Sequence, residues 1–185
     1  MSENAPRELT LETRASIADI PKSDWQQLAG VSNPFLRYEF FQSLEESGCA
    51  RTETGWTPSH LVFKHEGRIT GLAPAYLKTH SMGEYVFDWS WAEAYQRYGL
   101  PYYPKLLLAI PFTPSAGPRL LLDAEVRRQL TPERLHDLLD TLTHHLGAHS
   151  WHLLFPNAED QKLLTHDDEL HRIGCQFHWH NHNYH

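Results

Sequence analysis

The sequence predicts an α/β fold with a mixed central sheet and helices on both of its faces. Two observations indicate this: strands and helices alternate in the second half of the chain, and a β-hairpin lies in the first half. The chain has 185 residues, of which 41% are hydrophobic and 12% aromatic, and this is enough to build one buried core. We therefore expect a disordered tail at residues 1–7 and a single domain over residues 8–185.

The N-terminal segment predicts one strand and two helices. Apolar and polar residues alternate from Leu9 to Ile17, as in a strand with one face in water. The string Ser23–Gln26 matches a capping box, so a short helix is expected to begin there and to end at Gly30. A second helix is expected from about Arg37 to Ser47, where Gly48 follows it.

The clearest local pattern is a hairpin. Strands are expected from His60 to His65 and from Arg68 to Thr79, joined by Glu66-Gly67. This pair of turn residues is of the two-residue type that favours a tight hairpin. Pro74 interrupts the second strand, and because proline cannot donate to a ladder we expect an edge position or a bulge there.

The following segment predicts a strand, a loop and the strongest helix of the chain. Residues 105–110 are expected to form a buried strand, 111–118 a rigid loop, and 119–122 extended structure. Thr131 can cap the helix and Pro132 suits its first turn. A stripe of leucines marks the helix face that we expect to be buried: Leu135, Leu138, Leu139, Leu142 and Leu146.

The C-terminal segment predicts two further strands around a short helix. Ser150 to Phe155 is the first strand, and Asn157 caps the helix. Gly174 to His180 is expected to be the last strand. Residues on one face of that strand are apolar: Cys175, Phe177 and Trp179.

Charge and hydropathy exclude several classes of partner. The chain has 16 basic and 23 acidic residues, a formal net charge of −7, so no global attraction draws it to DNA or to anionic lipid. The longest apolar run, Leu106 to Ile110, is too short to span a membrane. Residues 1–14 are polar and lack the apolar segment of a secretory signal, so we expect a cytoplasmic protein.

An aromatic and polar segment at residues 88–104 is the best candidate binding surface. Tyrosine and tryptophan offer flat apolar faces with polar tips, which suit sugars and peptide stems. Either Asp88 or Glu93 could act as a general base if it is buried beside these rings. The alternative is a loop whose aromatic residues cap the sheet while its carboxylates face water. The candidate binding residues are Trp89, Trp91, Tyr95, Tyr98, Tyr102 and Tyr103.

Histidines and cysteines offer weaker candidates. His178, His180 and His182 alternate and would share one face of a strand, where neighbours could share a divalent metal. No carboxylate or cysteine supports them at a suitable spacing, so we expect structural or solvated histidines and no metal. Cys49 and Cys175 lack a neighbouring base and are expected to be buried structural thiols.

The order of elements resembles the acetyltransferase fold of the GNAT superfamily. Seven strings make the resemblance more specific: Asn33-Pro34-Phe35, Asp88-Trp89-Ser90-Trp91-Ala92-Glu93-Ala94-Tyr95, Tyr98-Gly99, Tyr102-Tyr103-Pro104-Lys105-Leu106, Pro111-Phe112-Thr113-Pro114, Gly117-Pro118-Arg119-Leu120 and Gln176-Phe177-His178-Trp179-His180-Asn181. With these strings the chain resembles, over nearly its whole length, the FemAB-like family, whose bacterial members are described as peptidoglycan biosynthesis or recognition proteins.

The resemblance implies a GNAT-like domain of an acyltransferase or aminoacyltransferase. FemAB-like proteins carry two GNAT-like halves, and this chain resembles the first half. Its expected role is to shape an acceptor groove for a peptide or peptidoglycan precursor, without being catalytically complete alone. A second half, or a second copy joined through the C-terminal strand, would be the partner. The alternative is a non-catalytic binding module that uses residues 88–104 or the terminal strand.

The resemblance also bears on cofactors. GNAT enzymes hold the coenzyme A pyrophosphate on the free N–H groups of a glycine-rich loop at a helix N-terminus. Here the loop after the strand at 105–110 contains Pro111, Pro114 and Pro118, and each proline removes one donor. We therefore expect no coenzyme A binding and no other cofactor, which fits FemAB relatives because they take aminoacyl-tRNA.

Overall fold

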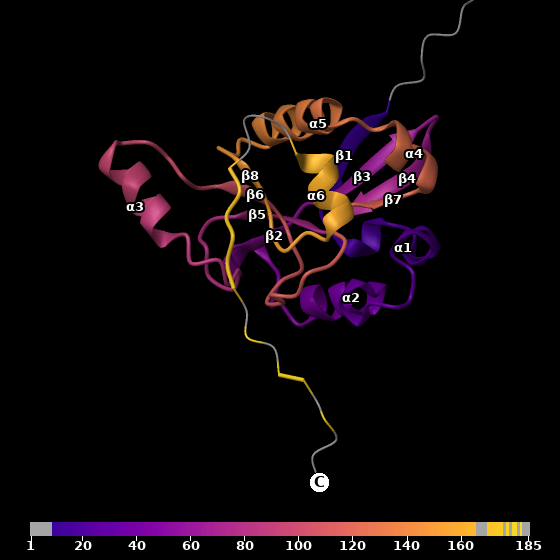
Figure 1. Cartoon of the computed structure of the whole chain (residues 1–185), viewed down its shortest axis with the longest axis horizontal. Coiled ribbons are helices and arrows are strands. Elements are labelled where there is room, and N and C mark those ends of the chain that lie inside the picture. Colours follow the sequence, from indigo (N-terminus) through magenta and orange to yellow (C-terminus); the bar gives the residue numbers. More distant parts are fainter. Residues whose placement is uncertain (1–8, 166–169, 176, 178, 181, 183–185) are drawn as a thin grey trace, which may run out of the picture.

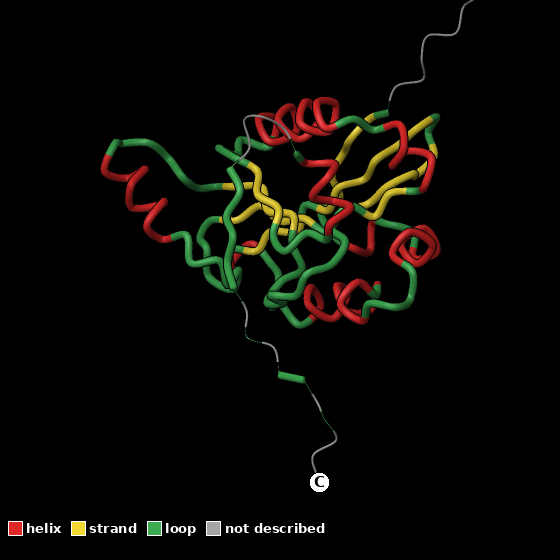
Figure 2. Tube along the Cα trace, in the orientation of Figure 1, coloured by secondary structure: helices red, strands yellow, loops and turns green. Residues whose placement is uncertain are grey.

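The computed structural model describes residues 9–165, 170–175, 177, 179, 180 and 182, and it has the predicted α/β fold. Its strands form two four-stranded sheets (Figures 1 and 2). The first sheet has the order β1-β3-β4-β7, and its strands are all antiparallel: Thr10–Arg14 (β1), His60–His65 (β3), Arg68–Ala73 (β4) and Leu121–Leu122 (β7).

The second sheet has the order β2-β5-β6-β8 and is mixed, because β6 and β8 run parallel. Its other neighbouring strands are antiparallel. The strands are Trp56–Pro58 (β2), Ala75–Lys78 (β5), Lys105–Leu108 (β6) and Trp151–Leu153 (β8).

Pro74 separates the two sheets. The hairpin of β3 and β4 is confirmed, with Gly67 at φ +77° in its turn, a conformation that glycine adopts without strain. At Pro74 the chain leaves the first sheet, and β5 continues in the second. Because proline has no N–H to donate, the ladder breaks there, while the Pro74 carbonyl accepts the Ala109 N–H. The break divides the strands between two sheets where the sequence predicted one.

Helices cover both faces of the strands, as predicted (Figure 1). Trp25 in α1 and Phe41 in α2 pack with Val62 on one face. On the opposite face, Leu61 and its neighbours pack against the leucine stripe of α5 together with α4 and α6. The helices are Lys22–Ala29 (α1), Tyr38–Glu46 (α2), Ala124–Gln129 (α4), Pro132–His145 (α5) and Ala158–Leu164 (α6).

Most predicted helix boundaries are confirmed, but two details at the N-terminus are wrong. The side chains of Thr131 and Asn157 cap α5 and α6. By contrast, α1 begins at Lys22 after Pro21, whose fixed φ suits a helix start, so the predicted capping box at Ser23–Gln26 is not used. The first strand ends at Arg14 because Ser16 caps a 3-10 turn instead.

The predictions for the C-terminal strand and for the cysteines are wrong. The described residues within 174–180 are not in a strand, and the Phe177 side chain is fully exposed. A strand needs a neighbour for its backbone groups, and the described part of the chain places none beside this segment. Cys49 and Cys175 are exposed rather than buried, because one lies in the turn after α2 and the other in this segment.

The predicted tail at residues 1–7 lies outside the described residues. Among the helices of the described part, none is long and apolar enough to cross a bilayer.

Candidate functional site

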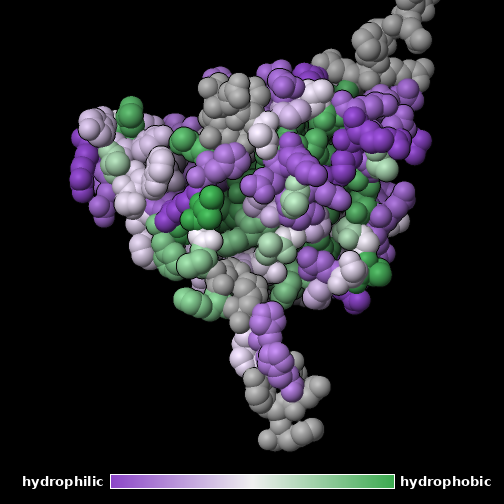
Figure 3. Space-filling view, in the orientation of Figure 1, coloured by the Kyte–Doolittle hydropathy of each residue, from purple (hydrophilic) through white to green (hydrophobic). Residues whose placement is uncertain are grey.

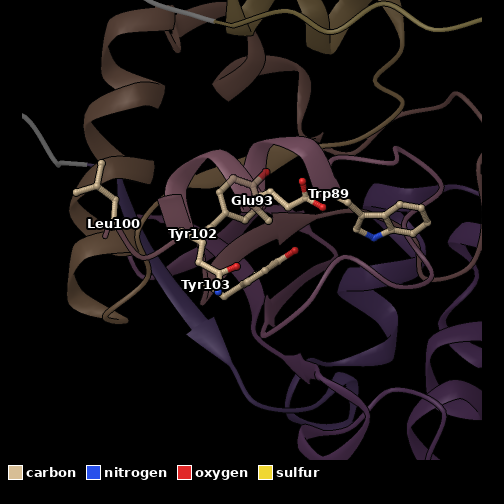
Figure 4. Close-up of a pocket in the computed structure, with 7 residues that line it drawn as sticks. Trp89, Glu93, Leu100, Tyr102 and Tyr103 are labelled. Atoms are coloured by element: carbon tan, nitrogen blue, oxygen red, sulfur yellow. The ribbon is translucent and has the colours of Figure 1, made fainter. Parts of the chain in front are cut away.

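A pocket of about 420 Å³ lies where residues 79–104 leave the second sheet. This segment carries α3 (Trp89–Arg97), which stands away from the sheets at the left of Figure 1. One helix face and the chain that returns to β6 form its walls (Figure 4). The lining residues are Trp89, Ala92, Glu93, Gln96, Leu100, Tyr102 and Tyr103.

The sequence did not predict α3, and its surroundings explain why. None of its residues is buried, so the helix lacks the stripe of buried apolar residues that marks a core-facing helix in a sequence. The helix ends where Gly99 adopts φ +68°, a left-handed conformation typical of helix C-termini. Apolar surface gathers between this arm and the centre of the molecule, green in Figure 3.

The structure brings some of the predicted binding residues together and leaves others apart. Trp89, Tyr102 and Tyr103 line the pocket, and Figure 4 shows the Glu93 carboxylate between Trp89 and Tyr102. Trp91 and Tyr98 lie outside it, and Tyr98 is 81% exposed.

Tyr95 supports the pocket without lining it. Its ring packs edge-on against Tyr102, with the centroids 5.2 Å apart.

A buried charge network lies beneath the pocket, and Lys105 is its centre. Its ammonium group donates to Asp88 Oδ2 at 2.7 Å, Glu84 Oε2 at 2.8 Å and Ser81 Oγ at 2.9 Å. All four side chains are buried. A buried ammonium is tolerated only when its donors are paired, and here all three have partners.

Two tyrosine hydroxyls connect the network to the pocket. The Tyr102 hydroxyl donates to Asp88 Oδ2 at 2.8 Å, and the Tyr103 hydroxyl shares a hydrogen bond of 2.6 Å with Ser81 Oγ. Both rings also lie over Lys105, with its nitrogen 5.3 and 5.6 Å from their centroids. The network therefore holds these two rings of the pocket wall in place.

The network shifts the pKa values of its two carboxyl groups in opposite directions. Burial would raise the pKa of Asp88, but hydrogen bonds from Lys105, Ser81 and Tyr102 bring it down to about 2. Burial raises the pKa of Glu84 above its usual value, although the charge of Lys105 opposes this. Asp88 is therefore firmly ionised, whereas Glu84 is the easier of the two to protonate.

Two further basic groups beside the network have lowered pKa values. Burial lowers the pKa of Lys78 to about 7, against the attraction of Glu84. Its nitrogen lies 3.7 Å from the centroid of a Trp56 ring. Burial, together with the charge of Lys105, lowers the pKa of His152 to about 4. This imidazole is therefore neutral at pH 7.

The two candidate bases differ sharply in their surroundings. Asp88 is buried, as the hypothesis required, but its low pKa makes it a weak base. Glu93 is exposed and lies 3.4 Å from Arg97 on the same helix. Asp88 therefore belongs to the buried network, whereas Glu93 lines the pocket itself.

The backbone of the network is strained at two residues. Tyr85 and Phe87 have φ values of 62° and 52°, which non-glycine residues rarely adopt. Their side chains are exposed, while Glu84 and Asp88 on either side point inward. Strain of this kind persists only where surrounding contacts impose it, and it concentrates at functional sites.

Sequence reasoning missed Lys105, Glu84 and Ser81. One signal was present: Lys105 opens a run of buried leucines that was predicted to be a strand, and a lysine there must have partners. Glu84 and Ser81 carried no comparable signal, because the contacts that bury them come from the tertiary fold.

The histidine candidates do not form a metal site in the described part of the chain. His180 and His182 are exposed there, and no cluster of three ligating side chains occurs among the described residues. His178 lies outside the described residues.

A family model described as peptidoglycan biosynthesis/recognition matches residues 16–185. No curated protein and no solved structure matches the chain.

Proposed function

The chain belongs to the FemAB-like family of peptidoglycan biosynthesis/recognition, and from this premise we propose that its aromatic pocket binds a peptidoglycan precursor as an acceptor. The single observation that carries the proposal is the composition of that pocket. Trp89, Tyr102 and Tyr103 present aromatic faces, while Glu93 and Gln96 supply polar groups. Small-molecule sites typically combine a mostly apolar lining with a few polar groups that orient the ligand.

The buried network supports this proposal, because it prepares the pocket before a ligand arrives. Lys105 fixes Asp88 and Ser81, and these in turn hold the hydroxyls of Tyr102 and Tyr103. A wall that is already ordered loses little conformational freedom on binding, and this improves affinity.

We propose that the domain shapes the acceptor side of an acyl or aminoacyl transfer and that a second GNAT-like half supplies the donor. The loop after β6 supports this division. It contains three prolines and leads into β7 rather than into a helix, so it lacks the free N–H groups with which a helix N-terminus would hold a pyrophosphate. Coenzyme A is therefore not expected to bind there.

A non-catalytic binding module is the second candidate, and the state of Asp88 favours it. With a pKa of about 2 and an ion pair to Lys105, this carboxylate is a poor proton acceptor. A transfer assay with a disaccharide-peptide and a mixture of aminoacyl-tRNAs, followed by mass spectrometry, tests an expectation that the two candidates share. Both expect no mass gain with this chain alone; a gain would overturn the division into halves.

Calorimetry with soluble disaccharide-peptides from digested peptidoglycan tests the binding itself. We expect saturable binding that Tyr103→Ala weakens at least ten-fold, because the variant removes a ring that lines the pocket. Tyr98→Ala is the matched control, since Tyr98 is exposed and lies outside the pocket. Absence of binding, or equal weakening by both variants, contradicts the proposal.

A further inference from the structure

We infer that the pocket recognises a neutral sugar ring of its ligand, rather than a peptide carboxylate or a phosphate group. The inference rests on the proposed function and names the part of the ligand that the pocket contacts.

The charges in and around the pocket disfavour an anionic ligand group. Among the described residues that line the pocket, Glu93 is the charged one, and its carboxylate lies 3.4 Å from the Arg97 guanidinium on the same helix. The lysine beneath the pocket, Lys105, has its donors occupied by Asp88, Glu84 and Ser81. Arg97 is likewise paired, with Glu93. An entering carboxylate or diphosphate would have to displace Glu93 from Arg97, whereas proteins recognise such groups with Arg or Lys side chains that are available to pair with them.

The aromatic residues of the pocket favour a sugar ring. Trp89 is 56% exposed and lines the pocket together with Tyr102 and Tyr103 (Figure 4). The C–H face of a sugar ring is apolar and packs against an aromatic face, as other apolar groups do. A free peptide or an anion offers no such rigid flat surface, so the aromatic faces favour a sugar ring.

The polar groups of the pocket can hydrogen-bond to the hydroxyl groups of a sugar, which need new partners when they leave water. Glu93 and Gln96 lie one turn apart on the same face of α3. The carboxylate accepts hydrogen bonds from sugar hydroxyls, and the amide both donates and accepts. These groups sit beside the aromatic faces, so one ring can pack and hydrogen-bond at the same time.

Titrations with the separate chemical parts of a precursor test this inference. The probes are tetra-N-acetylchitotetraose, the free stem pentapeptide, inorganic pyrophosphate and an intact disaccharide-peptide, each followed by tryptophan fluorescence and calorimetry. We expect saturable binding of the tetrasaccharide and of the disaccharide-peptide. The pentapeptide and pyrophosphate are expected to bind at least ten-fold more weakly.

Matched variants localise the binding. Trp89→Ala is expected to weaken tetrasaccharide binding at least ten-fold, whereas Trp91→Ala is expected to leave it within two-fold. Both tryptophans are exposed on α3, but Trp89 alone of the two lines the pocket. Glu93→Gln provides a second test without loss of packing, and we expect weaker tetrasaccharide binding because a carboxylate accepts hydrogen bonds more strongly than an amide.

The outcomes separate the inference from the proposed function. If the disaccharide-peptide binds but the tetrasaccharide does not, the sugar inference is overturned while the proposed function stands. If the pentapeptide or pyrophosphate binds as tightly as the tetrasaccharide, the inference is also overturned. If the disaccharide-peptide itself does not bind, the proposed function fails, and the inference fails with it.

Discussion

Lys105 connects the fold to the pocket. It lies at the start of β6, fully buried, and its ammonium group holds Asp88, Glu84 and Ser81 together. Burying three charged groups is costly unless they are paired, and removing one partner leaves the others uncompensated. The geometry of the pocket therefore depends on a residue that is not part of the pocket lining.

Replacing Lys105 by methionine is expected to lower the free energy of unfolding by about 3–5 kcal/mol, the range for breaking a buried ion pair. Chemical denaturation measures it. The control is Lys22→Met, because Lys22 pairs with Glu39 at the surface and such pairs contribute about 1 kcal/mol or less. Equal effects of the two substitutions would contradict the role given to Lys105.

His152 makes stability depend on pH. Its pKa is about 4 in the folded state against an ordinary value of 6.5, so the unfolded chain binds the proton first as the pH falls. This contribution is present above pH 6.5 and is lost as the pH falls towards 4, by as much as about 3 kcal/mol.

We expect His152→Gln to remove this loss of stability at low pH. Unfolding curves recorded at pH 7, 5.5 and 4.5 would measure it. His149→Gln serves as the control because His149 is exposed. If the free energy of unfolding of His152→Gln still falls with pH as steeply as that of the wild type, other groups cause the pH dependence.

At the scale of elements, the sequence predicted the capped helices α5 and α6 but missed α4, although Asp123 caps that helix and Val126 is buried in the core. The helices α5 and α6 begin where Thr131 and Asn157 predict. The arm helix α3 escaped prediction because it faces no core. The prediction of a last strand at residues 174–180 is wrong for another reason. Alternation of apolar and polar residues predicts a strand, but a strand also needs a neighbouring strand to pair with.

Helix α6 is tied to the rest of the fold through Asp160. This buried carboxylate accepts the backbone N–H groups of Arg119 and Leu120, and it pairs with Arg127. It therefore joins α6 to the start of β7 and to α4.

Asp160→Ala is expected to lower the free energy of unfolding by about 3 kcal/mol or more, because it leaves buried donors without an acceptor. Glu159→Ala, one residue earlier and exposed, is expected to change it by about 0.5 kcal/mol or less. Thermal unfolding followed by circular dichroism distinguishes the two; a small effect of Asp160→Ala would argue against this anchor.

At the scale of the whole molecule, the sequence predicted the fold class and part of the site. It identified Trp89, Glu93, Tyr102 and Tyr103, which line the pocket. It could not predict the buried network, because the partners of Lys105 lie 17 to 24 residues away in sequence. Nor could it predict that Pro74 divides the strands into two sheets, since an edge position and a bulge were equally compatible with a proline.

The segment after α6 leaves large apolar side chains exposed: Leu170, Ile173, Phe177 and Trp179. Exposed apolar groups favour association, so we expect the chain to self-associate at high concentration. Light scattering would compare the wild type with Phe177→Ser/Trp179→Ser, in which association should decrease. A wild type that stays monomeric at millimolar concentration would refute this expectation.

The most direct test of the binding site uses the indole N–H signals of the six tryptophans in an NMR titration with a disaccharide-peptide. We predict that the Trp89 signal shifts with saturation. The signal of Trp25, whose indole N–H is buried and donates to the Leu36 carbonyl, should stay in place. A titration in which Trp89 does not shift, although the ligand binds, would contradict the assignment of the pocket as the binding site.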